Sequence, residues 1–265
     1  MKLADVNTTD IRDAIALGCA TMGRVFDADD GEGDIPFFDV FVRPQARMAF
    51  SPWGSECHVP GRHLNALLNA EDAAGIEIDE DAVDRHARAA FYSYSGPIAF
   101  PLNRDVVGGT LKNFAAHHAR EGFHALYALA KYRDSDRARA VAEAAIAAIN
   151  EYWDPDSDWD YERLGREHGL VALPNQPFMH GLARAIGPLV KYYRATGFGP
   201  ALGLATVLKD KCLAEVFDSE GSYDRERFGD HTHSTTCVMS SLAQLADLTS
   251  DSTLMQGVKA FYDNG

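Results

Sequence analysis

Residues 151–154, Glu-Tyr-Trp-Asp, followed by Trp-Asp at 159–160, form a pattern that returns later in the chain. The second copy is Glu-Val-Phe-Asp at 215–218 followed by Tyr-Asp at 223–224, at a constant offset of 64 residues. Each copy comes at the end of a segment with helical periodicity, and a repeat of this length is typical of stacked helical hairpins. We therefore expect the same turn to end two equivalent hairpins.

A third copy of this hairpin is expected at the end of the chain. Leu-Ala-Lys-Tyr-Arg at 129–133 resembles Leu-Val-Lys-Tyr at 189–192, and Leu-Ala-Asp-Leu at 245–248 takes the corresponding place in the third copy. The last residues, 261–265, resemble 217–221, so the sequence stops inside the turn where the earlier copies continue. This predicts a fragment of a longer protein, with an apolar edge left open.

Apolar residues recur every three to four positions through almost the whole chain, which predicts an all-α protein. In one segment Leu64, Leu67 and Leu68 form an apolar face, while Arg62 and Asn65 lie on a polar one. Nine helices are expected, at about residues 9–27, 58–74, 79–94, 112–133, 135–153, 177–196, 199–217, 235–249 and 252–262.

The composition predicts one soluble domain, residues 1–265, with no nucleic-acid or membrane partner. Hydrophobic residues make up 46% of the chain, enough for a large core, and the net charge of -14 would repel nucleic acid and anionic membranes. No signal-peptide pattern and no run of about 18 uncharged apolar residues occurs. The four cysteines have no CxxC spacing, so we expect neither disulfides nor a thiolate zinc site, and we predict a cytoplasmic location.

Histidines are concentrated at the starts of four predicted helices. Because equivalent ends of repeated helices tend to converge in space, these histidines predict one shared pocket. The stretch at 28–57, rich in Gly, Pro and Phe, is expected to be a long loop or short hairpin that folds over it. The alternative is that the histidines are capping or surface residues. They are His58, His63, His117, His118, His180, His231 and His233.

The hairpin lengths, the Tyr- and Leu-rich ends of the inner helices and the Asp-x-x-Gly-x-Tyr turns resemble the six-hairpin glycosidases. In this resemblance, residues 231–237, His-Thr-His-Ser-Thr-Thr-Cys, open the last inner helix. Residues 240–247 and 262–264 are similar to bacterial proteins related to β-L-arabinofuranosidases and β-glucuronidases. The resemblance implies an α/α toroid of about twelve helices. It also implies a hydrolase of carbohydrate metabolism. The arabinofuranosidase zinc site of three cysteines and a glutamate has no counterpart here.

Two carboxyl groups are commonly needed for glycoside hydrolysis, one as proton donor and one as nucleophile or base. We favour Glu121 and Asp230 as this pair, because each lies near histidines that can tune it. His117, His231 and His233 are predicted to assist them in a histidine-rich central pocket.

The predicted substrate is an oligosaccharide, and a uronate-containing one would suit the basic residues near the pocket. Arg62 and Arg120 could hold its carboxylate, and the equally open alternative is that they pair with Glu56 or Glu121. Asp72 is either a binding residue or a solvated charge. The predicted substrate-binding residues are Glu56, His58, Arg62, His63, Asp72, His118, Arg120, His180 and Tyr223.

Other functions remain open at this stage. A sugar epimerase or isomerase, or a polysaccharide lyase, would use the histidines for proton transfer, and a noncatalytic helical-repeat protein would only bind. His117, Glu121 and His124 lie at i, i+4 and i+7 on one helical face, and His231 and His233 could add metal ligands. No matched Cys/His set appears, so neither a metal nor another cofactor is predicted. The sugar, the linkage, the stereochemical outcome and the oligomeric state do not follow from the sequence.

Overall fold

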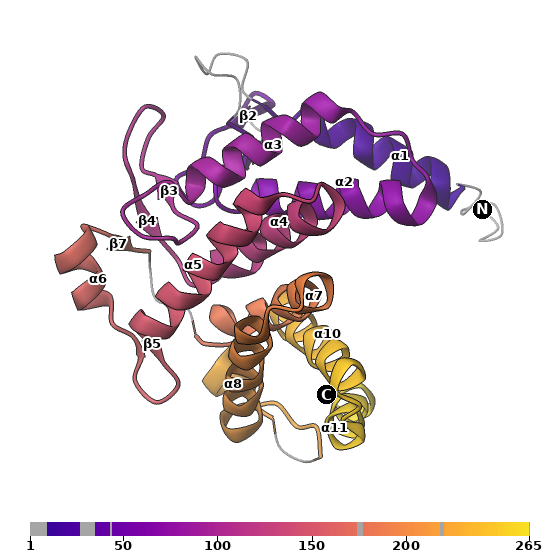
Figure 1. The fold of residues 1–265 in the computed structure, drawn as a ribbon, viewed down its shortest axis with the longest axis vertical. Helices are drawn as coiled ribbons and strands as arrows, with labels where there is room; N and C mark the ends of the chain where they lie inside the picture. The colour runs from indigo at the N-terminus through magenta and orange to yellow at the C-terminus, as the bar shows by residue number, and fades with distance from the viewer. Residues whose placement is uncertain (1–9, 27–34, 43, 174–176, 218–219, 265) are drawn as a thin grey trace.

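The computed structural model describes residues 10–26, 35–42, 44–173, 177–217 and 220–264 (Figure 1). This part of the chain is mostly helical, which confirms the all-α prediction. Its eleven α-helices are α1 Ile11–Met22, α2 Val59–Ala74, α3 Glu80–Ser93, α4 His118–Tyr132, α5 Asp136–Tyr152, α6 Tyr161–His168, α7 Ile186–Thr196, α8 Gly199–Glu215, α9 Arg225–Phe228, α10 Thr232–Thr249 and α11 Ser252–Asn264. The short strands are β1 Asp39–Phe41, β2 Arg47–Ala49, β3 Asn103–Arg104, β4 Leu111–Phe114, β5 Trp153–Asp154, β6 Asp158–Trp159 and β7 Val171–Ala172.

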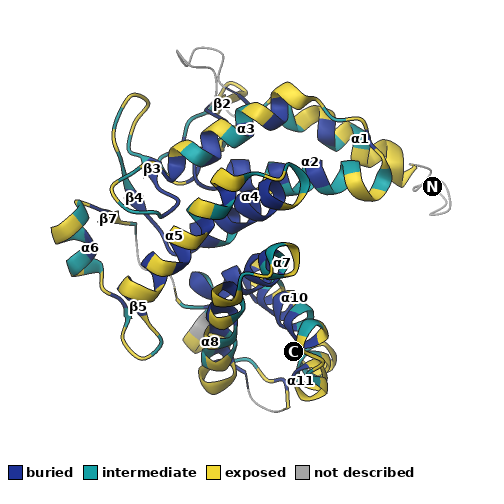
Figure 2. Ribbon diagram, in the orientation of Figure 1, coloured by how far each residue is buried: buried dark blue, intermediate teal, exposed yellow. Residues whose placement is uncertain are grey.

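Four helices, α2, α4, α7 and α10, pack in series, each against the next. Each of them is followed by a helix that packs on it, which gives the pairs α2 with α3, α4 with α5, α7 with α8 and α10 with α11 (Figure 1). α4 lies between α2 and α7 and is the most deeply buried of them (Figure 2). The chain therefore alternates between a helix of a continuous row and a helix that covers it.

Several helix starts follow from capping residues visible in the sequence. The Asp79 side chain accepts a hydrogen bond from the Asp81 backbone N–H at the start of α3, and Ser135 accepts one from Ala138 at the start of α5. Pro60 occupies the first turn of α2, where a missing N–H costs nothing. α2 ends at Gly75, whose φ of 57° is in the left-handed region that glycine adopts without strain.

The repeated turn has the same backbone pairing in both copies. Trp153 pairs with Trp159 in the antiparallel ladder of β5 and β6, and Phe217 pairs with Tyr223 in an antiparallel bridge. Both residues of the second pair lie 64 positions after those of the first. The equivalence that the sequence predicts is thus present in the described residues of both turns.

The helix expected at 112–133 begins later than predicted. Leu111–Phe114 instead form β4, which pairs antiparallel with β3 and parallel with β7, so α4 starts only at His118. The start of the segment expected at 177–196 is a turn followed by a 3-10 helix, Leu182–Ala185, that leads into α7. α6 and α9 were not predicted, because they are short and consist mainly of polar residues.

Part of the stretch at 28–57 forms a hairpin. β1 and β2 pair antiparallel, with Val40 opposite Met48, while residues 27–34 and 43 lie outside the described part of the chain. The ring of Phe38, just before β1, contacts the ring of His58 at a centroid distance of 5.4 Å. The hairpin therefore adjoins the start of α2, where a predicted site residue lies.

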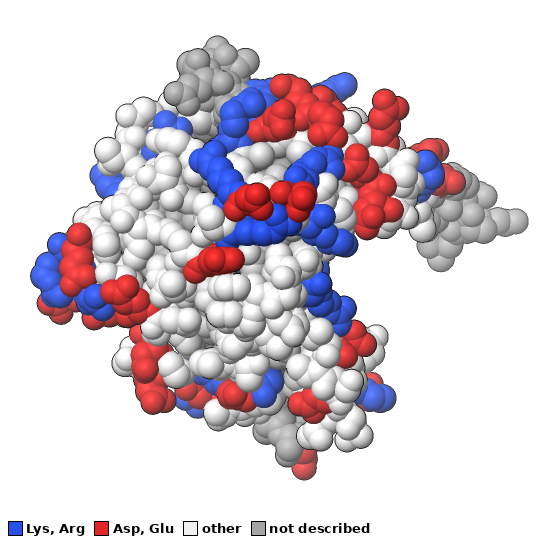
Figure 3. Space-filling model, viewed as in Figure 1, with Lys and Arg blue, Asp and Glu red and all other residues white. Residues whose placement is uncertain are grey.

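Charges of both signs are interspersed on the face of the molecule in Figure 3. Arg133, for example, pairs with Glu71 at 2.9 Å and with Glu80 at 2.7 Å. None of the helices in the described residues has the length and apolar character that crossing a membrane requires.

Candidate functional site

Most of the predicted pocket histidines surround one cavity of about 390 Å³. It lies at the starts of α2, α4 and α10 and beside the 3-10 helix that precedes α7. Ring centroids are 5.6 Å apart for His58 and His117, and 5.4 Å apart for His180 and His231. The described residues that line this central cavity are His58, Arg62, His117, His180, Arg184, His231, His233 and Ser234.

A fully buried carboxylate, Glu121, stands behind this wall on the first turn of α4. Its Oε1 atom accepts a hydrogen bond from Arg62 Nε at 3.1 Å and one from Arg120 Nη1 at 2.5 Å. Arg184 Nη2 lies 3.5 Å from the same oxygen, and His58 Nε2 lies 3.7 Å from it. Arg62 and Arg120 thus pair with Glu121. This is the structural alternative expected for these arginines, in which they pair with a glutamate of the protein.

The environment of Glu121 keeps its carboxyl group ionised. Burial alone would raise its pKa, but interaction with His58, Arg120, Arg184 and Arg62 outweighs burial and lowers the pKa from 4.5 to about 2. A group in this state does not donate a proton at neutral pH. Within the predicted catalytic carboxyl pair, Glu121 is therefore poorly suited to be the proton donor. Its position suits holding the arginines in place.

Substitution of Glu121 tests this structural role. We expect Glu121→Gln, which keeps the shape but removes the charge, to lower the free energy of unfolding by about 3 kcal/mol, because the buried Arg184 guanidinium loses its charged partner. Urea denaturation monitored by circular dichroism measures the change. The matched control is Glu162→Gln on α6, whose carboxylate is 92% exposed and lies 3.8 Å from Arg166. The control should stay within about 0.5 kcal/mol of the wild type, and an equal loss in both variants would contradict the prediction.

His58, His117 and His118 form a compact group at the inner wall of the central cavity. One ring nitrogen of each lies within 4.8 Å of the others, and the rings of His117 and His118 are 4.0 Å apart. Burial lowers the pKa of His58 to about 3 and that of His118 well below its ordinary value, so both imidazoles are neutral at pH 7. His118 Nδ1 lies 3.1 Å from Cys57 Sγ, and burial raises the pKa of that thiol.

His231 and His233, at the start of α10, also line the central cavity. The His231 side chain caps the helix, because its Nδ1 atom accepts a hydrogen bond from the Ser234 backbone N–H at 3.2 Å. This fixes a tautomer in which Nε2 carries the proton. His233 is exposed and borders both the central cavity and a neighbouring one of about 310 Å³. Burial and then the charges of Arg184, Arg120 and Arg62 lower the pKa of His233.

His63 does not face the central cavity. Its Nδ1 atom lies 3.1 Å from His86 Nε2, and that nitrogen also lies 3.0 Å from the Met22 carbonyl oxygen of α1. Burial lowers the pKa of His63 to about 4 and that of His86 to about 3. The pair connects α2, α3 and α1, so the structure places His63 in helix packing and apart from the other predicted binding residues.

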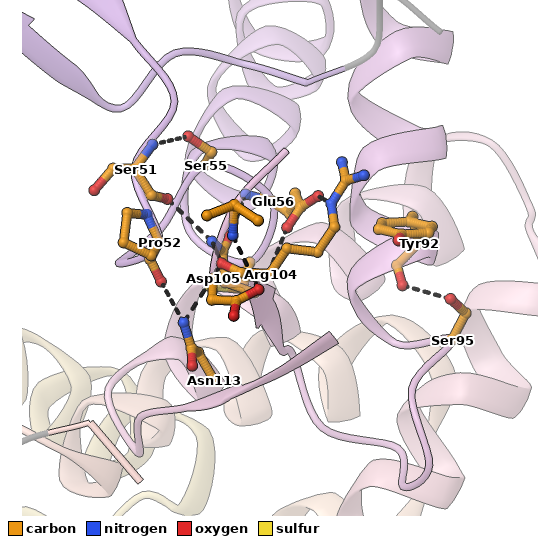
Figure 4. A network of polar contacts seen from close by, with 12 residues as sticks. Ser51, Pro52, Ser55, Glu56, Tyr92, Ser95, Arg104, Asp105 and Asn113 are labelled. Carbon is orange, nitrogen blue, oxygen red and sulfur yellow. Dashed lines mark hydrogen bonds and ion pairs between the residues drawn. The ribbon is translucent and has the colours of Figure 1, made fainter. Parts of the chain in front are cut away.

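Glu56 also lies in a structural network (Figure 4). Its carboxylate pairs with the Arg104 guanidinium and accepts a hydrogen bond from the Arg104 backbone N–H at 2.9 Å. Its own backbone N–H donates to Asn103 Oδ1 at 2.8 Å, and Asn103 also bonds the Ser51 carbonyl. These contacts attach the segment before α2 to β3.

Asp72 lies near the other end of α2. Its carboxylate is 59% exposed and lies 3.8 Å from Lys131 Nζ. Between this end and the central cavity, Asn69 accepts a hydrogen bond from Tyr132 OH at 2.8 Å. Asp72 thus has the surroundings of a solvated charge, the second of the two expectations for it.

Asp230 and Tyr223 border a different cavity, of about 530 Å³, together with Phe261. Asp230 is exposed, and Tyr223 OH donates a hydrogen bond to the Gly229 carbonyl at 3.1 Å. The buried Glu121 and the exposed Asp230 therefore have unlike surroundings. The charge of Asp230 still acts on a residue of the central cavity. Burial and His231 lower the pKa of His180, and Asp230 opposes this lowering.

Two cationic residues at these cavities were not predicted. Arg184 is 5% exposed and reaches Glu121, and its only signal in the sequence is a single charge inside the apolar run Leu-Ala-Arg-Ala-Ile at 182–186. Lys191 lines the neighbouring cavity together with Arg120 and His124. The alternative metal site considered from the sequence combined His117, Glu121 and His124. Among the described residues, the structure instead groups His117 with His58 and His118.

Comparison with known proteins adds no assignment: no protein-family model matches the chain, and no relative is found among curated proteins. The function must therefore be inferred from the chemistry of the site.

Proposed function

We propose that the central cavity binds the carboxylate of a uronate-containing oligosaccharide and that a neutral histidine removes the proton from the carbon beside that carboxylate. The observation that carries this proposal is the composition of the cavity wall, which combines two arginines with five histidines. None of the described residues that line it is acidic. An anionic substrate with a weakly acidic C–H bond suits these groups better than a neutral one.

Charge around the cavity supports an anionic ligand. Arg62, Arg120 and Arg184 share the single carboxylate of Glu121, so the cluster carries surplus positive charge. Because Glu121 is fully buried, this surplus is available on the cavity side, where Arg62 and Arg184 line the wall. A bound uronate would balance the charge and, once its carboxylate is neutralised, the adjacent proton becomes easier to remove.

His233 is the proposed base. It is exposed at the junction of two cavities, and its lowered pKa keeps it neutral and able to accept a proton. Two of the arginines that lower its pKa, Arg62 and Arg184, line the same cavity, so His233 would lie near a carboxylate bound by them. His231, with Nδ1 occupied by Ser234, would donate from Nε2 to a sugar hydroxyl.

Addition of a solvent-derived proton to the opposite face of the same carbon would give an epimerase. Breakage of the bond to the glycosidic oxygen on the next carbon, with a double bond formed between the two carbons and a proton taken up by the leaving oxygen, would give a lyase. Glycoside hydrolysis remains a second candidate, favoured by one observation. Asp230 is an exposed carboxylate on a cavity that also contains Tyr223, a ring on which a sugar could stack. A hydrolase would need a second carboxyl group, and Glu121 is poorly suited to be the acid.

We also infer that the row α2, α4, α7 and α10, with its covering helices, is part of an α/α toroid. The alternation of inner and outer helices around a polar cavity supports this inference. A cytoplasmic location fits the four free thiols, of which Cys19, Cys57 and Cys212 are buried.

Incubation in D₂O with neutral and uronate oligosaccharides, followed by mass spectrometry, tests the proposal. We expect one deuterium beside the carboxylate for an epimerase, or unsaturated fragments with no added water for a lyase. Fragments that together gain one water would establish hydrolysis instead. No change across the panel would overturn all three reactions and leave binding.

Variants assign the step to its residue. We expect His233→Gln to slow the reaction roughly a hundredfold or more, since a positioned base contributes about that much. The matched control is His168→Gln on α6, where the imidazole bonds Tyr152 OH at 2.8 Å, away from the cavity. Equal rates in the two variants would contradict the role of His233.

A further inference from the structure

We propose that His58, His117 and His118 bind one divalent transition-metal cation at the inner wall of the central cavity. One ring nitrogen of each lies within 4.8 Å of the others, close enough for a modest side-chain adjustment to bring three ligands onto one ion. The residues are 6%, 9% and 0% exposed, so the site is walled by protein on its inner side. Imidazole is a ligand that zinc, copper and nickel accept readily.

The surroundings of two of these rings support the proposal independently of their spacing. His58 Nε2 lies 3.7 Å from the Glu121 carboxylate, and His118 Nδ1 lies 3.1 Å from Cys57 Sγ. The other nitrogens, His58 Nδ1 and His118 Nε2, are buried and have no hydrogen-bond partner among the described residues. His118 is held at Nδ1 by the Cys57 thiol and has Nε2 left for an ion, which is the usual arrangement of metal ligands in proteins.

Two unpartnered nitrogens in one buried group would otherwise be costly. A buried polar atom without a partner destabilises a protein by about 1–3 kcal/mol. A metal ion would satisfy both atoms at once.

Three protein ligands leave a coordination position for water or substrate. His58 and His117 also line the central cavity, so that position is expected to open toward it. The ion would then lie on the same side as Arg62 and Arg184, whose charges oppose a bare dication. We therefore expect metal affinity to increase when an anion is bound, and this second expectation, unlike the site itself, rests on the proposed function.

Zinc titration of the purified full chain, stripped with a chelator, tests the site without any substrate. Isothermal calorimetry and elemental analysis are expected to give one zinc per chain, and cobalt(II) is expected to give the visible absorption of a four-coordinate site. His117→Gln should weaken zinc binding roughly a hundredfold or more. The matched control, His124→Gln on the same helix α4, should bind like the wild type.

His118→Gln is a second variant with the same expected loss, and circular dichroism establishes that each variant is folded. Absence of stoichiometric zinc on the folded wild-type chain, or equal affinity in all three variants, would overturn the site. Titration in the presence of galacturonate measures the coupling to an anion. Zinc binding with neither deuterium exchange nor unsaturated products would overturn the proposed function alone. Either of those outcomes from a chain that binds no zinc would overturn the metal site alone.

Discussion

Gly61→Ala is expected to prevent stable folding, because α2 and α4 meet at this glycine. A Cβ atom at position 61 would lie 1.8 Å from the carbonyl oxygen of Glu121 and 2.5 Å from its carbonyl carbon. These are backbone atoms of α4, which cannot turn aside as a flexible side chain can. The two helices would have to separate along their contact, at an expected cost of at least about 4 kcal/mol. That is a large share of the roughly 5–15 kcal/mol by which proteins are stable.

Gly203→Ala is the matched control for this prediction. Gly203 lies on α8, is exposed, and has no neighbouring atom within 4 Å of an added Cβ. The same substitution there should raise the free energy of unfolding by about 0.5–1 kcal/mol, since alanine favours helix more than glycine does. Urea denaturation of both variants measures the contrast. A Gly61→Ala chain as stable as the wild type would show that the helices do not approach this closely.

The close contact at Gly61 also builds the site. It brings the start of α2 onto the first turn of α4, so that Arg62 and His58 reach the buried carboxylate of Glu121. A larger residue at position 61 would push these groups away from the carboxylate. The small side chain is thus required both by packing and by the geometry of the cluster.

Much of the helical framework could be predicted because local signals agree with tertiary packing. α2 combines Pro60 at its start, an apolar face around Leu64 and Gly75 at its end, and these fix its limits. Residues 112–114 form part of a strand where the periodicity predicts a helix, because the strand is set by pairing with β3 and β7, which no local pattern reveals. The stacking of the helices into a row followed only from the repeat, and the toroid stays a prediction.

The site could be predicted in outline but not in its assignments. Histidines at helix starts were expected to converge, and five of them do line the central cavity. His58 and His63 could not both face it, because residues five apart on a helix point about 140° away from each other. This constraint was available from the sequence. The contact of Arg184 with Glu121 could not be predicted, since it depends on how the 3-10 helix Leu182–Ala185 packs on α4.

Acid should unfold this protein at a mild pH, because several histidines are buried in the neutral form. Burial lowers the pKa of His63 to about 4, and those of His86 and His124 to about 3, from 6.5. The charges of Arg62 and Arg85 lower the pKa values of the His63 and His86 pair further, and the Met22 carbonyl opposes them. For His124, Lys191, Arg120 and Arg62 act in the same direction and Glu121 opposes.

The sign of the effect follows from the protons bound in each state. Above about pH 6.5 these histidines are neutral in both the folded and the unfolded chain, so they leave stability unchanged. As the pH falls from 6.5 toward the folded pKa values, only the unfolded chain takes up the protons, and each histidine lowers the free energy of unfolding by about 1.4 kcal/mol per pH unit. Three such groups remove about 6 kcal/mol by pH 5, comparable with the whole stability of many proteins. Urea denaturation at about pH 7.5, 6 and 5 should therefore show a steep loss of the free energy of unfolding. His63→Gln should reduce the slope of that free energy against pH by about one proton. A free energy of unfolding that stays level down to pH 5 would mean that these imidazoles are not buried in the neutral form.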